Sequence, residues 1–286
     1  MTDRIADISA RIDGIRQLGA VVNAMRGIAA ARAQQARGQI GAVDVYAATI
    51  AAAIGSALAL LPTDHPGEAG RSRHPALVVF CAEQGFAGTF SERVLDSVRA
   101  DLAGSELFLI GTRGAAIAAE RGITAVWQSA LPSHSPGVPK LADRIAEALY
   151  QRIATGEIDR LDAIFSLWAP GSSIRVERNR LFPLDVTNFA RAGGGNPPLL
   201  NLAPEALLGE LTADYLHAQL CHAALHTFAA ENQARMEAMA SAHTQIDRQL
   251  AALRTQQRQV RQEEITAEII ELAAGETASR ASARVR

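Results

Sequence analysis

The chain has 286 residues, of which 48% are apolar and 20% charged, so it is long enough to bury one or two hydrophobic cores. Its formal charge of -2 excludes a globally basic nucleic-acid-binding protein. The N-terminal residues MTDRIADISARIDGIR carry charges every few positions, which indicates no secretion signal. Cys81 and Cys221 lie far apart in apolar segments, a placement typical of buried, reduced thiols.

The first predicted element is one long helix over residues 1–61. Large apolar residues recur there at spacings of mostly three and four, which is the pattern of a coiled-coil seam: Ile5, Ile8, Ile12, Ile15, Leu18, Val22 and Met25. No proline precedes Pro62, so about 55 residues can continue as a single helix. Residues 45–61 are nearly long enough to cross a bilayer, but they are mostly alanine, with threonine, glycine and serine among them. We expect a packed helix and no direct membrane span.

Residues 74–190 have a different sequence pattern, in which short apolar runs alternate with amphipathic segments. We expect strands near Ala76–Cys81, Leu107–Ile110, Ala125–Trp127, Ala163–Trp168 and Ile174–Leu181. Helices are expected near Phe90–Leu102, Arg113–Arg121 and Val138–Ile153. This order predicts a compact α/β domain with a largely parallel sheet. Segments rich in turn residues, LPTDHPGEAGRSRHP and RAGGGNPPLLNLAP, flank it.

A second long helix is expected over residues 205–275. Its seam keeps a heptad spacing through Met236, Met239, His243, Ile246, Leu250, Leu253, Gln257 and Val260. The polar members His243 and Gln257 cost stability but can fix the register. After Val260 the seam jumps to Ile265, Ile269 and Leu272, which should change the winding of a coiled coil locally.

The turn after the first strand, EQGFAG, raises the question of nucleotide binding. A Walker loop needs a lysine after its last glycine, and the only lysine, Lys140, is far away. A dinucleotide fingerprint needs three glycines, whereas this turn has Gly85 and Gly88. We therefore interpret it as a strand-to-helix turn in which glycine serves the backbone, and we expect no cofactor.

Three histidines lie on the second long helix at spacings of five and four. Only His222 and His226 share a face, and no carboxylate stands between them as in a zinc protease motif, so we interpret these two and His217 as polar helix residues and expect no metal. Cys221 and His222 are sequence neighbours and point different ways on a helix. No serine-hydrolase elbow is present. The sequence predicts no catalytic residue.

Two stretches are recognisable. The opening helix ISARIDGIRQLGAVVNAMRGIAAAR contains an Ala24-Met25 pair followed by small residues. The closing helix contains Arg235-Met236, Ala238-Met239 and the run Arg261-Gln262-x-x-Ile265-Thr266-x-Glu268. In these stretches the chain resembles the gamma subunit family of F-type ATP synthase, whose members form the central rotor shaft of F1. The resemblance covers almost the whole chain, and the C-terminal run is its most specific part.

The resemblance implies a fold of two long terminal helices forming an antiparallel coiled coil, with a Rossmann-like α/β domain inserted between them. It implies a non-catalytic rotor that couples ion flow through the membrane c-ring to ATP synthesis or hydrolysis at the beta subunits. The implied partners are the alpha, beta and epsilon subunits and the c-ring. The implied location is the cytoplasmic face of a bacterial inner membrane, as a peripheral part of F1.

By the same resemblance, contacts with a beta-subunit loop should involve Met25, Glu231, Arg235, Gln262, Thr266 and Glu271. Glu231 and Arg235 are i and i+4, so they can instead pair with each other on one helix face. The C-terminal GETASRASARVR extends past the usual family end, and we expect it to fray. Two other functions remain open: a free coiled-coil scaffold and a Rossmann-like nucleotide-binding enzyme.

Overall fold

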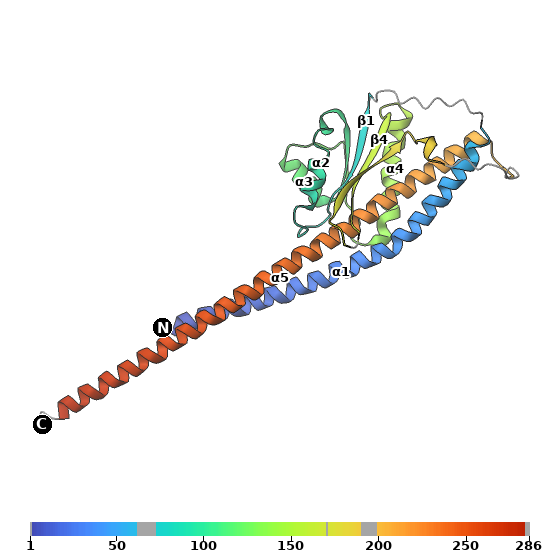
Figure 1. The fold of residues 1–286 in the computed structure, drawn as a ribbon. Coiled ribbons are helices and arrows are strands. Elements are labelled where there is room, and N and C mark those ends of the chain that lie inside the picture. Colours follow the sequence, from blue (N-terminus) through green and yellow to red (C-terminus); the bar gives the residue numbers. More distant parts are fainter. Residues whose placement is uncertain (1, 62–72, 170, 190–198, 284–286) are drawn as a thin grey trace. The chain divides into compact units, whose positions relative to one another are not determined.

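The computed structural model describes residues 2–61, 73–169, 171–189 and 199–283 (Figure 1). The chain forms two compact units: residues 28–237, here called the α/β unit, and residues 1–27 with 238–286, here called the coil unit. Helix α1 (Thr2–Leu58) and helix α5 (Pro204–Ala283) contribute to both. Both long helices are thus confirmed. Helix α5 runs past the expected end at residue 275 to Ala283, and the fraying of the C-terminal residues stays a prediction.

The α/β unit is built on a five-stranded sheet in the order β3-β2-β1-β4-β5. Its strands are β1 (Pro75–Phe80), β2 (Glu106–Ile110), β3 (Trp127–Ser129), β4 (Arg160–Leu167) and β5 (Arg175–Phe182). The first four are parallel, and β5 pairs antiparallel with β4. In the central strand, Val78 lies opposite Phe108 on one side and Ala163 on the other. A largely parallel sheet is confirmed.

Helices cover both faces of this sheet (Figure 1). Because side chains alternate along a strand, Leu77 and Val79 pack with α2 (Phe90–Ser97) and α3 (Thr112–Glu120). Val78 and Phe80 pack with α4 (Val138–Ala154) and the first half of α5. Short 3-10 helices lie at Leu102–Gly104, Ser135–Gly137 and Val186–Asn188. The Rossmann-like fold class is confirmed, with β3 beginning two residues later, β4 three residues earlier, and α2 ending earlier than expected.

The alanine-rich end of α1 packs inside the α/β unit. Ile50, Ile54 and Leu58 are buried in one cluster with Phe189. By length and composition alone, α1 contains a stretch that could cross a membrane. Of the most apolar window of α1, 28% is buried inside the α/β unit and the coil unit together.

In the coil unit, α1 and α5 run antiparallel and bury a narrow apolar seam. Val22 packs with Met239 and Ile246, whereas Ile8 and Ile12 pack with residues nearer the C-terminus, Leu253 and Val260. The polar seam residue Gln257 donates a hydrogen bond from Nε2 to Ser9 Oγ at 2.8 Å. This bond joins the two helices at one position, as expected for a residue that fixes register.

Two parts of the expected seam are wrong. Leu18 is 53% exposed, and its neighbour Gly19 faces α5 so closely that a Cβ there would lie 3.3 Å from Ile246 Cγ2. The helices approach too closely at this point for a large side chain. The continuation of the seam beyond Val260 is also wrong, because Ile265, Ile269 and Leu272 are 52%, 61% and 74% exposed. Helix α1 begins at Thr2 and does not cover them.

We expect Ile246→Asp to destabilise the coil unit by several kcal/mol, since Ile246 is 6% exposed and a carboxylate there would be buried without a partner. Leu18→Asp is the matched control and should change stability by less than about 0.5 kcal/mol. Hydrogen exchange of the coil-unit amides measures both effects. Equal protection in the two variants would contradict the observed seam.

Candidate functional site

A buried polar cluster of the α/β unit holds the turn that follows β1. The backbone N–H groups of Glu83 and Gln84 donate to Oε2 and Oε1 of Glu231 on α5, each at 3.1 Å. The preceding N–H, of Ala82, donates to Ser91 Oγ at 3.1 Å. Three consecutive N–H groups at the end of a parallel strand, which in a nucleotide site would face phosphate, are therefore bound by side chains of this chain.

Arg235, one helical turn after Glu231, closes the cluster. Its Nε donates to Gly85 O at 3.1 Å and its Nη2 to Gln84 O at 3.2 Å. Nη2 also donates to Glu231 Oε1 at 2.5 Å, and Nη1 donates to Asn232 Oδ1 at 3.1 Å. Arg235 and Glu231 are only 5% and 2% exposed. A buried ion pair is tolerable when its remaining donors and acceptors are also satisfied, and this pair meets that condition.

Hydrogen bonds also join this turn to the segments that follow β2 and β3. The Glu83 carboxylate accepts hydrogen bonds from Thr112 N at 2.9 Å, Thr112 Oγ1 at 2.8 Å and Leu131 N at 2.8 Å. Thr112 begins α3, and Leu131 follows β3. One carboxylate therefore links the segments after β1, β2 and β3.

The glycines that the backbone requires after β1 and β2 are not all those that the sequence predicted. Gly88 has φ of +61°, as expected for a turn that needs glycine, but Gly85 is not among the positive-φ residues of the described chain and Phe86 takes that conformation instead. The most constrained glycine is Gly111, after β2, with φ of +106°. A Cβ on Gly111 would lie 2.5 Å from Cys81 O. The backbone role of the turn is thus confirmed for Gly88 and wrong for Gly85.

The two cysteines are free and buried, as expected. Burial raises the pKa of Cys81 and of Cys221 to about 12 in each case. Both are therefore neutral thiols near pH 7, and a thiol is a poor nucleophile compared with a thiolate.

The structure brings some of the expected contact residues together. Glu231 and Arg235 form the helix-face pair described as the alternative, so the polar atoms of both are already bound within the chain. Gln262, Thr266 and Glu271 are exposed on the coil-unit part of α5, and Thr266 Oγ1 donates to Gln262 O at 2.8 Å. Their contact with a beta subunit stays a prediction.

The remaining expected contact residue, Met25, is partly buried beside the α1–α5 seam. Glu83 and Gly111 belong to the turn cluster but were not predicted from the sequence. An acidic residue directly after a buried strand was the available signal for Glu83.

Comparison with known proteins agrees with this architecture. The family model described as ATP synthase matches residues 4–278. The ATP synthase gamma chain of Beutenbergia cavernae is 29% identical over 289 residues, covering 95% of this chain and 97% of that one. The gamma chain of Clavibacter michiganensis is 26% identical, covering 89% of this chain and 91% of that one.

Solved structures share the fold. A chain from the Euglena gracilis mitochondrial ATP synthase, in a structure of its OSCP, F1 and c-ring, has a TM-score of 0.67 at 12% identity, covering 99% of this chain and 96% of that one. A chain from a structure of the rotor of the same synthase has a TM-score of 0.66 at 13% identity, covering 93% of this chain and all of that one. With the family model spanning nearly the whole sequence, the chain belongs to the ATP synthase gamma-chain family.

Proposed function

We propose that this chain is the central-stalk rotor subunit of an F1Fo ATP synthase. In this role it couples ion flow through the membrane c-ring to ATP synthesis or hydrolysis at the beta subunits. Its partners are the alpha, beta and epsilon subunits and the c-ring. The proposal is supported by family membership and by the buried seam of the coil unit, because two helices packed along a seam resist twisting better than one helix, as a rotating shaft requires.

One observation carries the proposal. Beyond Val260, helix α5 leaves the seam and continues as a helix whose large apolar residues are 52% to 74% exposed: Ile265, Ile269, Ile270 and Leu272. Helices with exposed apolar side chains of this size normally bind another protein. A rotor tip seated inside the ring of alpha and beta subunits supplies that partner. A free scaffold acting only through the α1–α5 seam would leave these side chains in water.

We propose further that the chain is not an enzyme by itself. The N–H groups at the β1 turn donate to Glu231 and Ser91, so binding a phosphate there would require breaking a buried cluster. The neutral thiols of Cys81 and Cys221 are equally unsuited to nucleophilic catalysis. These features disfavour the Rossmann-like enzyme.

The proposed location is peripheral, on the cytoplasmic face of a bacterial inner membrane and without a membrane span. The bacterial sources of the similar gamma chains support it. The packing of Ile50, Ile54 and Leu58 inside the α/β unit supports the absence of a span.

Reconstitution tests the function. The purified chain is mixed with the alpha and beta subunits of its own organism, and the mixture is followed by size exclusion and an ATPase assay. We expect one stable complex with ATPase activity higher than that of alpha and beta without the chain. Elution of the chain apart from alpha and beta would overturn the proposal, and stable homodimers of the chain alone would favour the scaffold.

The exposed face of Gln262 and Thr266 gives a finer test of the beta contact. The two residues are i and i+4 and share a face, so we expect Gln262→Leu with Thr266→Val to remove hydrogen bonds worth about 1 kcal/mol each. The complex should assemble, but its ATP turnover should fall roughly fivefold or more and its coupling to ion transport should weaken.

The matched control is Gln249→Leu with Thr244→Val, at two exposed positions nearer the α/β unit in sequence. It should leave turnover unchanged. Full, coupled activity in the Gln262/Thr266 variant would refute these two contacts and leave the rotor function standing.

A further inference from the structure

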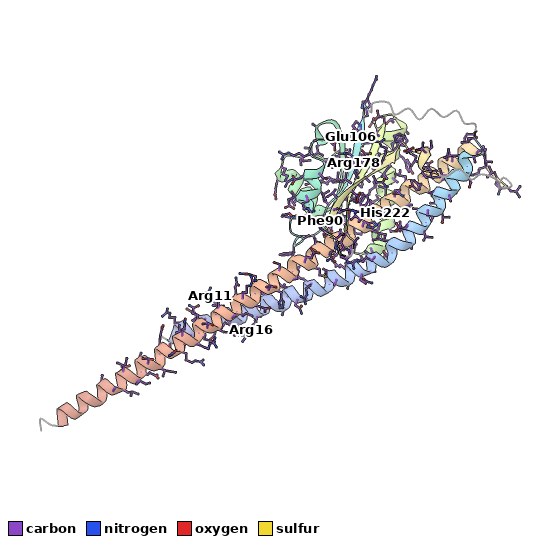
Figure 2. All side chains as sticks on the ribbon, viewed as in Figure 1. Arg11, Arg16, Phe90, Glu106, Arg178 and His222 are labelled. Carbon is purple, nitrogen blue, oxygen red and sulfur yellow. The ribbon has the colours of Figure 1, made fainter. Side chains whose placement is uncertain are left out.

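Two histidines and an aspartate converge inside the α/β unit. His222, labelled in Figure 2, and His226 lie one turn apart on α5, and their ring centroids are 4.3 Å apart. Asp44 on α1 approaches them, with Oδ1 3.5 Å from His222 Nε2. One ligand atom from each of the three residues lies within 4.8 Å of the others. No carboxylate lies between the two histidines in sequence, but Asp44, 178 positions before His222, brings one beside them.

The two rings lie against an aromatic side chain, and one of their ring nitrogens is buried without a partner in the described part of the chain. Phe165 packs edge-on against His222, with ring centroids 5.6 Å apart, and also contacts His226. His222 Nδ1 is buried, and among the described residues no hydrogen-bond partner faces it. The other ring nitrogen of His222, Nε2, faces the Asp44 carboxylate at 3.5 Å.

We propose that Asp44, His222 and His226 bind a divalent cation of the zinc type. Two imidazoles and one carboxylate form a ligand set that suits Zn²⁺, whereas Mg²⁺ and Ca²⁺ prefer oxygen ligands alone. Three protein ligands leave a fourth tetrahedral position for water. Donor atoms around tetrahedral zinc are about 3.3 Å apart, so the separations between the three ligand atoms, which lie within 4.8 Å of one another, need to shorten by up to about 1.5 Å. The Asp44 side chain is 51% exposed, against 23% for His222, so Asp44 has more room to make that movement.

A cation held here would link α1 to α5 within the α/β unit. Each ligand residue comes from a helix that packs on the same apolar cluster, whose members include Ala36 of α1 and Ala223 of α5. Binding to the folded chain alone stabilises it by mass action. The predicted consequence is a metal-dependent stability of this unit, and it stands independently of the proposed rotor function.

The test uses the full-length chain after treatment with a chelator. Zn²⁺ is titrated by calorimetry, and Tm is measured with Zn²⁺, with Mg²⁺ and with chelator. We expect one Zn²⁺ per chain and a Tm higher by several degrees with Zn²⁺ only. Asp44→Asn keeps the side-chain shape at a half-exposed position and should weaken Zn²⁺ binding by about tenfold or more. His226→Gln should abolish measurable binding.

Two controls locate the metal. His243→Gln removes a histidine that pairs with Asp247 in the coil unit, and it should leave the affinity unchanged. Cys221→Ala removes a thiol whose Sγ lies 3.9 Å from the His217 ring, and it should also leave the affinity unchanged. Absence of Zn²⁺ binding in the unmodified chain, full binding by both Asp44→Asn and His226→Gln, or loss of binding in Cys221→Ala would each overturn the proposed site.

Discussion

We expect Glu231→Gln to lower the free energy of unfolding by about 3–5 kcal/mol, the usual cost of removing one partner of a buried ion pair. Glu231 is 2% exposed and accepts hydrogen bonds from Glu83 N, Gln84 N and Arg235. A neutral amide keeps the shape but leaves the Arg235 guanidinium buried without a counter-charge. Urea unfolding followed by circular dichroism measures the change.

Two comparison variants sharpen this prediction. Glu237→Gln alters an exposed glutamate on the same helix and should change stability by less than about 0.5 kcal/mol. The double change Glu231→Gln with Arg235→Met removes both charges, so we expect it to be more stable than Glu231→Gln alone. Equal stability of the single variant and the unmodified chain would contradict the structural role of the pair. If the double variant assembles but loses ATPase activity, a direct role of the pair at the beta subunit gains support.

Gly111→Ala is the second change with a large expected effect, roughly 3 kcal/mol or more of destabilisation. Gly111 has φ of +106°, where a residue with a Cβ is strained, and the added Cβ would lie 2.5 Å from Cys81 O and 2.7 Å from Ala82 O. Both contacts are to backbone, so the end of β1 would have to move. The expected outcome is a large loss of soluble protein or a sharply lowered Tm.

Gly85→Ala is its control, because a Cβ at Gly85 meets nothing within 4 Å and its φ is not positive. We expect that variant to behave like the unmodified chain. If Gly85→Ala were damaging and Gly111→Ala tolerated, the close approach of Gly111 to the backbone of Cys81 and Ala82 would be contradicted.

Elements with a periodic apolar pattern could be predicted from the sequence, whereas contacts between residues far apart in sequence could not. Strand β1 and helix α4 lie within two residues of where alternation and amphipathic spacing predicted them. The seam up to Val260 was predictable for the same reason, except at Leu18. There the spacing of three and four admits Leu18 as well as Gly19, and only the close approach of Ile246 decides between them.

The polar clusters could not be predicted, because their members are far apart in sequence. The spacing of Glu231 and Arg235 indicated a possible helix-face pair, but nothing local showed that the pair holds a turn almost 150 residues earlier. Asp44 illustrates the same limit, since its approach to His222 depends on how α1 and α5 pack in the α/β unit. The orientation of such side chains is a property of the tertiary fold.

Direct observation of rotation tests the rotor function most plainly. Glu120→Cys places a single exposed thiol on α3, while Cys81 and Cys221 stay buried and unreactive. A bead or fluorophore is attached to that thiol in a complex with surface-bound alpha and beta subunits. We expect stepwise rotation of the probe in one direction when ATP is added, stopping when ATP is removed. A complex that hydrolyses ATP while the probe on this chain stays fixed would contradict it.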